Sequence, residues 1–520
     1  MSSEHPSSLY RWTVLGIIML GTFMAILDSS IVMVALPPMM SAFGVTRDKI
    51  EWVATAFMLA SAAVMPLVGW LAGRLGYKMV YLSCLFIFTA ASAGCALAWS
   101  YESLVAMRVL QAIGGGAIQP IGMAIVGDLF EPHERGKALG VWGTGVMVAP
   151  ALGPTLGGYL TDISSWRTIF SVNLPIGAVT LLAGLMIMRN HGKRNAKPLD
   201  IFGYGFLTMA LVSSLIALSN GQQEGWGSNY ILTCWALATI GFVMFIGIEL
   251  AVKYPILDLA LFKARNYSLS IVLAVFRAIG LFGGVFLLPI FLQNLAGYTT
   301  IQSGMWMIPA AVAVGVMMPI SGRLADRYGP RGLAALGSAF VGVSLLMFGN
   351  LDPMSGWPTI IIPQVLRGFG LALMMAPLIT AALNAVPKHE IPMASSFFSV
   401  AQNVGGAIGI AVMNTHVTNE AHRHAVRIGE LLPVQSQDFA RFAQRASEMV
   451  IRQSPGILPT PQVKSAFAAA QGMLRRAQVL GFDNGFVFAG WVIIAAIPLC
   501  LFLKASEHHK RGGGPAVAAE

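Results

Sequence analysis

The chain has 520 residues, of which 56% are hydrophobic and only 11% are charged, and its mean hydropathy is +0.70. Soluble chains carry about 25% charged residues, so this composition excludes an ordinary soluble enzyme, a nucleic-acid-binding protein and a secreted disulfide scaffold. The net charge of +10 is typical of basic cytoplasmic loops in a membrane protein. Cys84, Cys95, Cys234 and Cys500 lie inside apolar runs without metal-ligand spacing, so we expect no disulfide and no metal site.

Fourteen apolar segments follow one another along the chain, and each is long enough to cross a bilayer as a helix. Lipid offers the backbone no hydrogen-bond partner, so such segments must be helical. The first segment is interpreted as a helix rather than a signal peptide, because it contains Asp28 and further spans follow it. The predicted spans are 12–34, 52–72, 79–99, 104–126, 138–160, 169–188, 200–219, 231–252, 268–292, 304–324, 333–350, 359–383, 394–414 and 482–503.

The positive charges between the spans predict the orientation. With the N-terminus in the cytoplasm, the inner loops hold 19 lysines and arginines, whereas the short outer loops hold only Arg47, Lys49 and Arg167. Short basic loops stay inside the cell, so both termini are predicted to be cytoplasmic. The long connection at about 415–480 is then periplasmic, and mixed-charge stretches at 418–430 and 437–453 predict short amphipathic helices within it.

Similar segments recur about 255 residues apart: LAGRLGYK at 71–78 matches LADRYGPR at 324–331, and FEPHERGKA at 130–138 matches VPKHEIPMA at 386–394. Two related bundles around a central site are typical of transporters. The predicted parts of this all-α membrane protein are an N-terminal six-helix bundle (1–190), two inserted membrane helices with cytoplasmic linkers (191–266), a C-terminal six-helix bundle (267–505) and a cytoplasmic tail (506–520).

Five motifs resemble those of the major facilitator superfamily, and specifically of its fourteen-helix drug:proton antiporters of the EmrB/QacA type. LDSSIVMVALP at 27–37 is similar to the family pattern LDxTIVNVALP, and GWLAGRLGYK at 69–78 is similar to GxLaDrxGrk. RVLQAIGGG at 108–116 resembles RxxqGxGgg, and VMVAPALGPTLGGYL at 146–160 resembles the antiporter pattern gxxxGPxxGG. SSWRTIFSVNLPIG at 164–177 also matches the drug-exporter branch.

The resemblance covers essentially the whole chain, with departures at Gly73, where the family usually has Asp, and at Ala112, where it usually has Gly. It implies the major facilitator fold and a proton-coupled antiporter that exports lipophilic drugs or toxic amphiphiles from bacteria by alternating access. No cofactor is expected, because the proton gradient would supply the driving force. The implied partners are lipophilic small molecules, protons and membrane lipids, without nucleic acid. Either the 415–480 loop meets a periplasmic adaptor and an outer-membrane channel, or it only caps the transporter.

Asp28 is the one acidic residue well inside a predicted span, whereas Asp128, Glu249 and Asp483 lie near span ends, where they can reach water. A carboxylate at that depth must face water, pair with a cation or stay protonated, and each outcome suits a proton carrier. In the resembling family Arg108 faces the central cavity, where its fixed charge would tune the affinity of Asp28 for the proton. We interpret both as proton-coupling residues. The structural alternative is a permanent ion pair between two helices.

Arg108, Arg277 and Arg367 lie within spans. Arg277, near mid-span, is assigned to the substrate cavity together with Gln111. Arg367 is assigned to the cavity as well, with interhelical packing as the alternative. Three buried guanidiniums against one carboxylate leave the interior formally +2. This excess predicts a preference for anionic or weakly acidic amphiphiles over quaternary ammonium compounds, and Arg277 is the residue expected to set it.

Small residues and prolines crowd the fifth predicted span. Small residues at four-residue spacing let another helix approach closely, and prolines remove backbone donors and bend the helix. We interpret this segment as a sliding or rocking seam between the two halves. Its residues are Gly145, Pro150, Gly153, Pro154, Gly157 and Gly158.

The repeated basic loops are interpreted as cytoplasmic latches that involve Arg74, Asp128, Asp326 and Arg327. Basic groups at helix ends can pair with acids on neighbouring helices, and Asp128 is the candidate acid for the first loop. Only the second loop keeps its own acid, Asp326, because Gly73 stands at the matching position. The alternative is that these loops are basic only because they stay in the cytoplasm.

Other functions stay open as alternatives. An exporter or flippase of an endogenous lipid-like metabolite would use the same fold, and a nutrient symporter is disfavoured by the antiporter pattern. A membrane enzyme is disfavoured because no nucleophile, base or metal constellation lies at membrane depth. His416, His422 and His424 cluster in the sequence, but their spacing matches no standard metal site.

The orientation can be tested with impermeant thiol reagents. In intact cells, Ser436→Cys in the predicted outer loop should be labelled and Asn195→Cys in the predicted inner loop should not, because only one of them faces outward. The chain without an added cysteine is the control. The reverse labelling pattern would overturn the predicted orientation.

Overall fold

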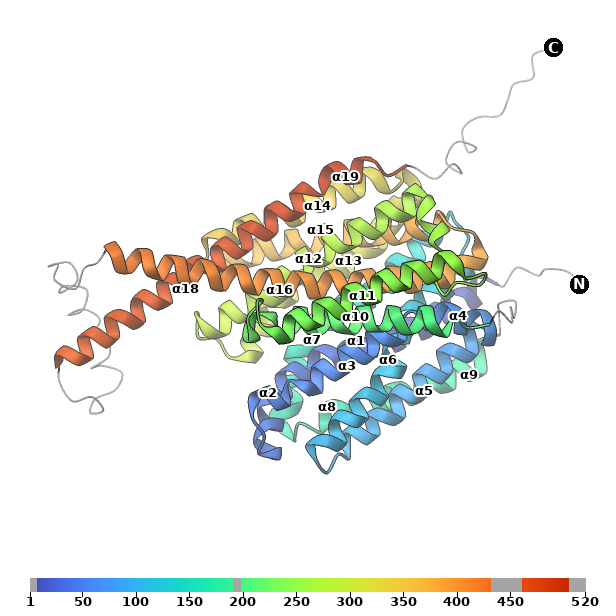
Figure 1. The fold of residues 1–520 in the computed structure, drawn as a ribbon. Coiled ribbons are helices and arrows are strands. Elements are labelled where there is room, and N and C mark those ends of the chain that lie inside the picture. Colours follow the sequence, from blue (N-terminus) through green and yellow to red (C-terminus); the bar gives the residue numbers. More distant parts are fainter. Residues whose placement is uncertain (1–6, 190–197, 432–460, 505–520) are drawn as a thin grey trace, which may run out of the picture.

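The computed structural model describes residues 7–189, 198–431 and 461–504, and in this part of the chain the regular structure is entirely helical. The long helices run roughly side by side and form one bundle (Figure 1). Of these helices, 13 are long and apolar enough to cross a membrane, and a bent pair raises the number to 14. The predicted all-α membrane fold with fourteen spans is therefore confirmed.

The first six spans are built from nine helices. The second span is the bent pair: α3 and α4 meet at an angle of 55°, and Pro66 between them lacks the N–H that would continue the hydrogen-bond ladder. The helices are α1 (Ser8–Phe43), α2 (Arg47–Ile50), α3 (Trp52–Val64), α4 (Leu67–Leu75), α5 (Tyr77–Ala96), α6 (Tyr101–Leu129), α7 (Arg135–Ile163), α8 (Thr168–Ser171) and α9 (Asn173–Ile187).

Two further spans, α10 (Ile201–Glu224) and α11 (Asn229–Ala251), pack against each other. Helix α10 also contacts α3 and α16, so this inserted pair lies beside both predicted halves. The remaining helices are η1 (Leu259–Lys263), α12 (Arg265–Asn294), α13 (Thr300–Tyr328), α14 (Pro330–Met347), η2 (Phe348–Asn350), α15 (Trp357–Asn384), η3 (Lys388–Glu390), α16 (Ile391–Leu431), α18 (Pro461–Ala495) and α19 (Ile497–Leu501).

The predicted loop at 415–480 is wrong at both of its ends. Helix α16 continues to Leu431 and α18 begins at Pro461, so both helices project beyond the bundle (Figure 1). The stretch 418–430, predicted as a separate short helix, is the end of α16, because no proline and no glycine before Gly429 interrupts the helix there. The predicted helix at 437–453 lies outside the described residues, as do Ser436 and Asn195.

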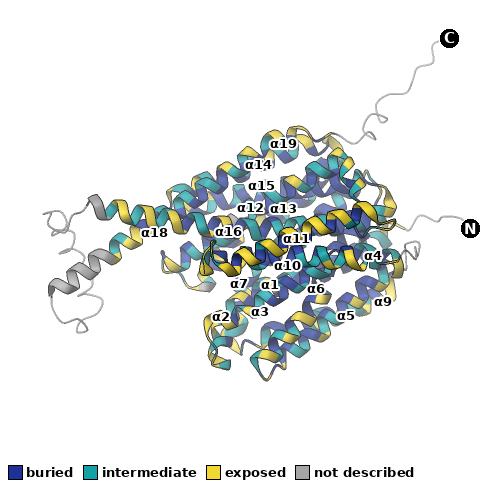
Figure 2. Ribbon diagram, in the orientation of Figure 1, coloured by how far each residue is buried: buried dark blue, intermediate teal, exposed yellow. Residues whose placement is uncertain are grey.

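Burial separates an inner core from an apolar outer surface (Figure 2). The faces that the helices turn toward one another are buried, whereas large apolar side chains such as Met186, Val243 and Val312 are exposed on the outside. A soluble protein of this size would not expose so many apolar side chains, but a surface in contact with lipid requires them. The outer surface therefore fits a bilayer.

Contacts between the predicted halves are concentrated on a few helices. Helix α7 packs on α1 within its own half and on α13 of the other half, and α4 and α6 both pack on α16. The polar clusters of the candidate site lie among these packed helices.

Candidate functional site: a buried charge network

A charged pair lies in the interior where α1 meets α6. Asp28 is 0% exposed and Arg108 is 1% exposed, and Arg108 Nη1 donates to Asp28 Oδ2 at 2.5 Å. Arg108 Nε also donates to the carbonyl oxygen of Val53, at 3.1 Å. The structure thus brings together the two residues that the sequence assigned to proton coupling. An ion pair with this burial is costly to break from one side, because the remaining charge would be left without a partner.

Two amides complete the surroundings of the carboxylate. Gln111 Nε2 and Asn173 Nδ2 both donate to Asp28 Oδ1, at 3.0 Å and 2.7 Å. Gln111 also accepts from Arg108 Nη1 at 2.6 Å and donates to Ser92 Oγ at 2.7 Å. Helices α1, α5, α6 and α9 therefore meet in one network of hydrogen bonds. Gln111, assigned to the substrate cavity from the sequence, is a direct partner of Asp28.

Sequence reasoning missed Asn173 and Ser92 as members of this network. Asn173 lies in the 164–177 segment that resembles the drug-exporter branch, which was the only signal that could have singled it out. Its Oδ1 atom is buried without a hydrogen-bond partner. The site therefore holds one unused acceptor directly beside the carboxylate.

Aromatic rings cover the guanidinium of the pair. The Cζ atom of Arg108 lies 4.1 Å from the ring centroid of Phe57 on α3 and 5.8 Å from that of Phe170 on α8. Ring faces attract a cation, more strongly where water is excluded. The positive charge is therefore held by a carboxylate, a carbonyl and two rings, which fixes Arg108 against α3, α8 and α1.

The other two intramembrane arginines have different surroundings. Arg277 on α12 and Arg367 on α15 are each 1% exposed. Arg277 Nη2 donates to Gln402 Oε1 at 2.5 Å, but the Nε and Nη1 atoms of both arginines are buried without a hydrogen-bond partner. Within the described ranges neither forms an ion pair. The structure therefore places Arg277 and Arg367 in the interior, apart from the network around Asp28.

Of the four glycines assigned to the seam, three face α1 rather than the other half. A Cβ atom at Gly145, Gly153 or Gly157 would lie within 2.8 Å or less of Met19, Ser30 or Ile31 on α1, whereas one at Gly158 would lie 3.0 Å from Ile301 on α13. Pro150 and Pro154 lie inside α7. Close backbone approach between the halves occurs instead near the start of α7, where Gly136 and Gly140 lie against Gly322 and Met318 of α13.

Asp326 joins the two halves at the start of α7. Its Oδ1 accepts from the backbone N–H of Gly136 and its Oδ2 from that of Lys137, both at 2.8 Å. The first N–H groups of a helix have no partner within the helix, and Glu134 at the cap position makes no side-chain hydrogen bond there. Asp326, from α13, therefore caps α7. We call this contact the Asp326 latch and this end of the bundle the basic end.

The two arginines assigned to the latches, Arg74 and Arg327, lie against aromatic rings. Arg74 is exposed and lies 5.3 Å from the ring centroid of Trp70, and Arg327 is exposed and lies over Tyr328. Glu249 was expected to reach water because it lies near a span end, but it is buried. The residue is 6% exposed, and its Oε1 accepts from the backbone N–H of Leu257. The linker after α11 folds over this end of the span and covers it.

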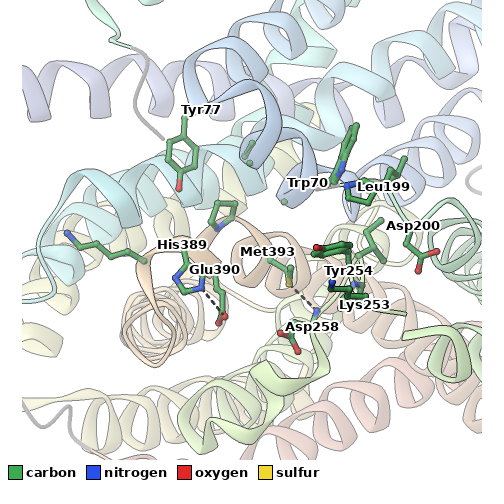
Figure 3. A pocket seen from close by; sticks show the side chains of 18 of the residues that line it. Trp70, Tyr77, Leu199, Asp200, Lys253, Tyr254, Asp258, His389, Glu390 and Met393 are labelled. Carbon is green, nitrogen blue, oxygen red and sulfur yellow. Dashed lines mark hydrogen bonds and ion pairs between the residues drawn. The ribbon is translucent and has the colours of Figure 1, made fainter. Parts of the chain in front are cut away.

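The equivalent position in the first half opens into a pocket of about 720 Å³ (Figure 3). The repeat places Gly73 where Asp326 stands and Pro392 where Gly136 stands, and both line this pocket. Gly73 has no carboxylate and Pro392 has no N–H, so the acceptor and one of the two donors of the latch are missing. Asp128 lines the pocket together with the linkers of the inserted helices, and the backbone N–H of Asp258 donates to Met393 Sδ at 3.1 Å.

Known proteins resemble this chain over nearly its whole length. A family model described as Major Facilitator Superfamily matches residues 18–410. The Multidrug transporter protein MdtP of Bacillus subtilis (strain 168) is 32% identical over 97% of this chain and 95% of its own. The Multidrug export protein EmrB of Escherichia coli (strain K12) is 29% identical over 96% of each chain. The crystal structure of the human organic anion transporter MFSD10 (TETRAN) aligns with a TM-score of 0.59, covering 93% of this chain and 99% of that one at 14% identity, which shows a likeness of fold alone.

The Asp326 latch can be tested by hydrogen–deuterium exchange. Asp326→Asn removes the charge and one acceptor oxygen, so the amides of Gly136 and Lys137 should exchange at least about tenfold faster, as expected for the loss of a hydrogen bond to a charged group. The matched control is Gly73→Asn, whose added Cβ meets open space and which should leave these amides unchanged. Equal protection in both variants would contradict the latch.

Proposed function

The chain belongs to the Major Facilitator Superfamily, and we propose that it is a proton-coupled antiporter that exports lipophilic drugs or toxic amphiphiles across the bacterial cytoplasmic membrane. The observation that carries this proposal is the buried ion pair of Asp28 and Arg108 between α1 and α6. Relatives named as multidrug exporters support the export of drugs. The chain is a transporter and not an enzyme, and both of its termini would lie in the cytoplasm.

The network gives a physical reason for coupling protons to helix packing. With Asp28 ionised, its oxygens accept from Arg108, Gln111 and Asn173. Protonation removes the charge that holds Arg108 and turns one of these oxygens into a donor, so the hydrogen bonds from the three donors weaken and the new O–H needs an acceptor. An uncompensated guanidinium is costly in a low-dielectric interior. The protonated state therefore favours an arrangement of α1 and α6 in which Arg108 reaches water or another anion.

Asn173 offers a place for the proton. If its amide turns over, the free Oδ1 atom accepts a hydrogen bond from protonated Asp28, whereas in the ionised state Nδ2 donates to the same carboxylate. The side-chain amide can thus serve both protonation states without a change of backbone. This makes Asn173 a positioning residue of the proposed proton site.

The proposal predicts that Asp28→Asn abolishes proton-driven export without unfolding the protein, because the amide keeps the shape of the side chain but carries no proton. One proton moving through about 150 mV supplies roughly 3.5 kcal/mol, so its loss should reduce uphill export by about a hundredfold or more. The measurement is drug-dependent proton movement in proteoliposomes, with one acidic, one neutral and one cationic lipophilic drug tested in parallel.

The matched control is Asp48→Asn, the same chemical change at an exposed position on α2, which should transport at the rate of the unchanged protein. Export by Asp28→Asn at the unchanged rate under a pH gradient would remove the proton-coupling role. Transport of lipids but of none of the three drugs would favour a flippase instead.

A further inference from the structure

Arg367 is a buried cation without a counter-charge. It is 1% exposed, and its Nε and Nη1 atoms have no hydrogen-bond partner. The acidic side chains described in the C-terminal half are those of Asp326, Asp352, Glu390, Glu420 and Asp483. Asp326 accepts from the start of α7, Glu420 from Arg423, and Asp483 from the backbone N–H of Leu351. No carboxylate among them neutralises Arg367. A lone guanidinium in a dry interior costs several kcal/mol, of the order seen for buried charges that lose their partner.

The N-terminal half shows what occupies the equivalent place. Arg108 and Arg367 are matched by the sequence repeat, and Arg108 is paired with Asp28. Matched segments of the two halves lie 253 to 259 residues apart, which places the counterpart of Asp28 between residues 281 and 287, and Gly284 lies at the centre of this range. The guanidinium of Arg367 lies directly against Gly284, so that a Cβ atom there would overlap Arg367 Nη1. A glycine thus stands in the second half where the first half has its carboxylate.

A second guanidinium, that of Arg277, lies on the same face of α12 as Gly284. Arg277 precedes Gly284 by seven residues, which is two helical turns or about 10.5 Å along the axis. Arg277 Nη2 is held by Gln402 on α16, whereas its Nε and Nη1 have no partner. Residues seven apart face the same way along a helix, so Arg277 and Gly284 lie on one face of α12. Because Arg367 of α15 contacts Gly284, the guanidiniums of Arg277 and Arg367 both lie along this face. Neither has an acid to pair with in the described part of the C-terminal half.

We propose that Arg367, above Gly284, binds the acidic group of the exported substrate, and that the substrates are organic monoanions with an apolar body. This inference rests on the proposed export function and names its substrate class. The anion would lie beside Arg367 in the position that corresponds to that of Asp28 beside Arg108. Its apolar part would pack against the apolar side chains of the surrounding helices. Arg277 provides a second anion position two turns nearer the basic end. The sequence favoured Arg277 as the charge-selecting residue, whereas the surroundings of Gly284 assign that role first to Arg367.

The test introduces an acid at position 284 of the chain itself. Gly284→Asp places a carboxylate against Arg367, whose flexible end can move to accommodate the new side chain. Binding of labelled 2-naphthoate to the full chain in lipid nanodiscs should weaken by about tenfold or more, since the internal carboxylate competes for the same guanidinium. The matched control is Gly284→Asn, which adds almost the same volume without the charge and should weaken binding less than about threefold.

Charge selectivity is measured with the 2-naphthyltrimethylammonium cation as the second probe. The unchanged protein should bind the anion at least about tenfold more tightly than the cation, and Gly284→Asp should reverse or remove this preference. Equal effects of Gly284→Asp and Gly284→Asn on 2-naphthoate, or equal binding of both probes by the unchanged protein, would overturn the inference. Because binding is measured without a gradient, this failure is distinct from loss of proton-driven export in Asp28→Asn, which concerns the proposed function.

Discussion

A charge in the interior of a membrane protein must find an opposite charge, a polar partner or water, and this constraint organises the structure. The first half satisfies it internally: Asp28 and Arg108 neutralise each other, and Gln111 and Asn173 satisfy the carboxylate further. The second half does not satisfy it within the described residues, since Arg367 is equally buried and unpaired. A fold built from two related bundles thus contains one complete charge pair and one incomplete pair, and only the complete pair contains a carboxylate.

The same divergence appears at the basic end, but with the halves exchanged. There the second half keeps its acid, Asp326, which caps α7, whereas the first half has Gly73 in the matching position and a pocket beside it. The sequence has Gly73 in place of the acceptor and Pro392 in place of one of the two donors, so a substitution at Gly73 alone would not rebuild both hydrogen bonds of the Asp326 latch. Each half therefore keeps one of two acidic positions. Linkers of the inserted helices lie where the first latch is missing and contact α16 through Met393.

The sequence was sufficient to predict the spans, because hydrophobic length is a local signal. The meeting of Asp28 with Arg108 was predicted from the rarity of intramembrane charge together with the resemblance to the family. It could not predict Ser92 and Asn173, since polar residues near span ends are common and only tertiary packing turns these two toward Asp28. The ends of α16 and α18 were missed for another reason: hydropathy marks where the lipid ends, whereas a helix continues until a residue interrupts it. The cover over Glu249 likewise comes from a linker whose path the sequence does not reveal.

Separate places for the proton and for an anionic substrate have an electrical consequence. If one proton enters through the site at Asp28 for each monoanion that leaves past Arg367, every cycle moves two positive charge equivalents inward. The membrane potential then contributes about 4.6 kcal/mol per 100 mV, twice the value for a single charge. Exchange of one proton for a monocation would move no net charge and would draw on the pH gradient alone. On the proposed mechanism, a second half whose buried cation lacks a carboxylate would therefore both select the sign of the substrate and couple its export to the membrane potential.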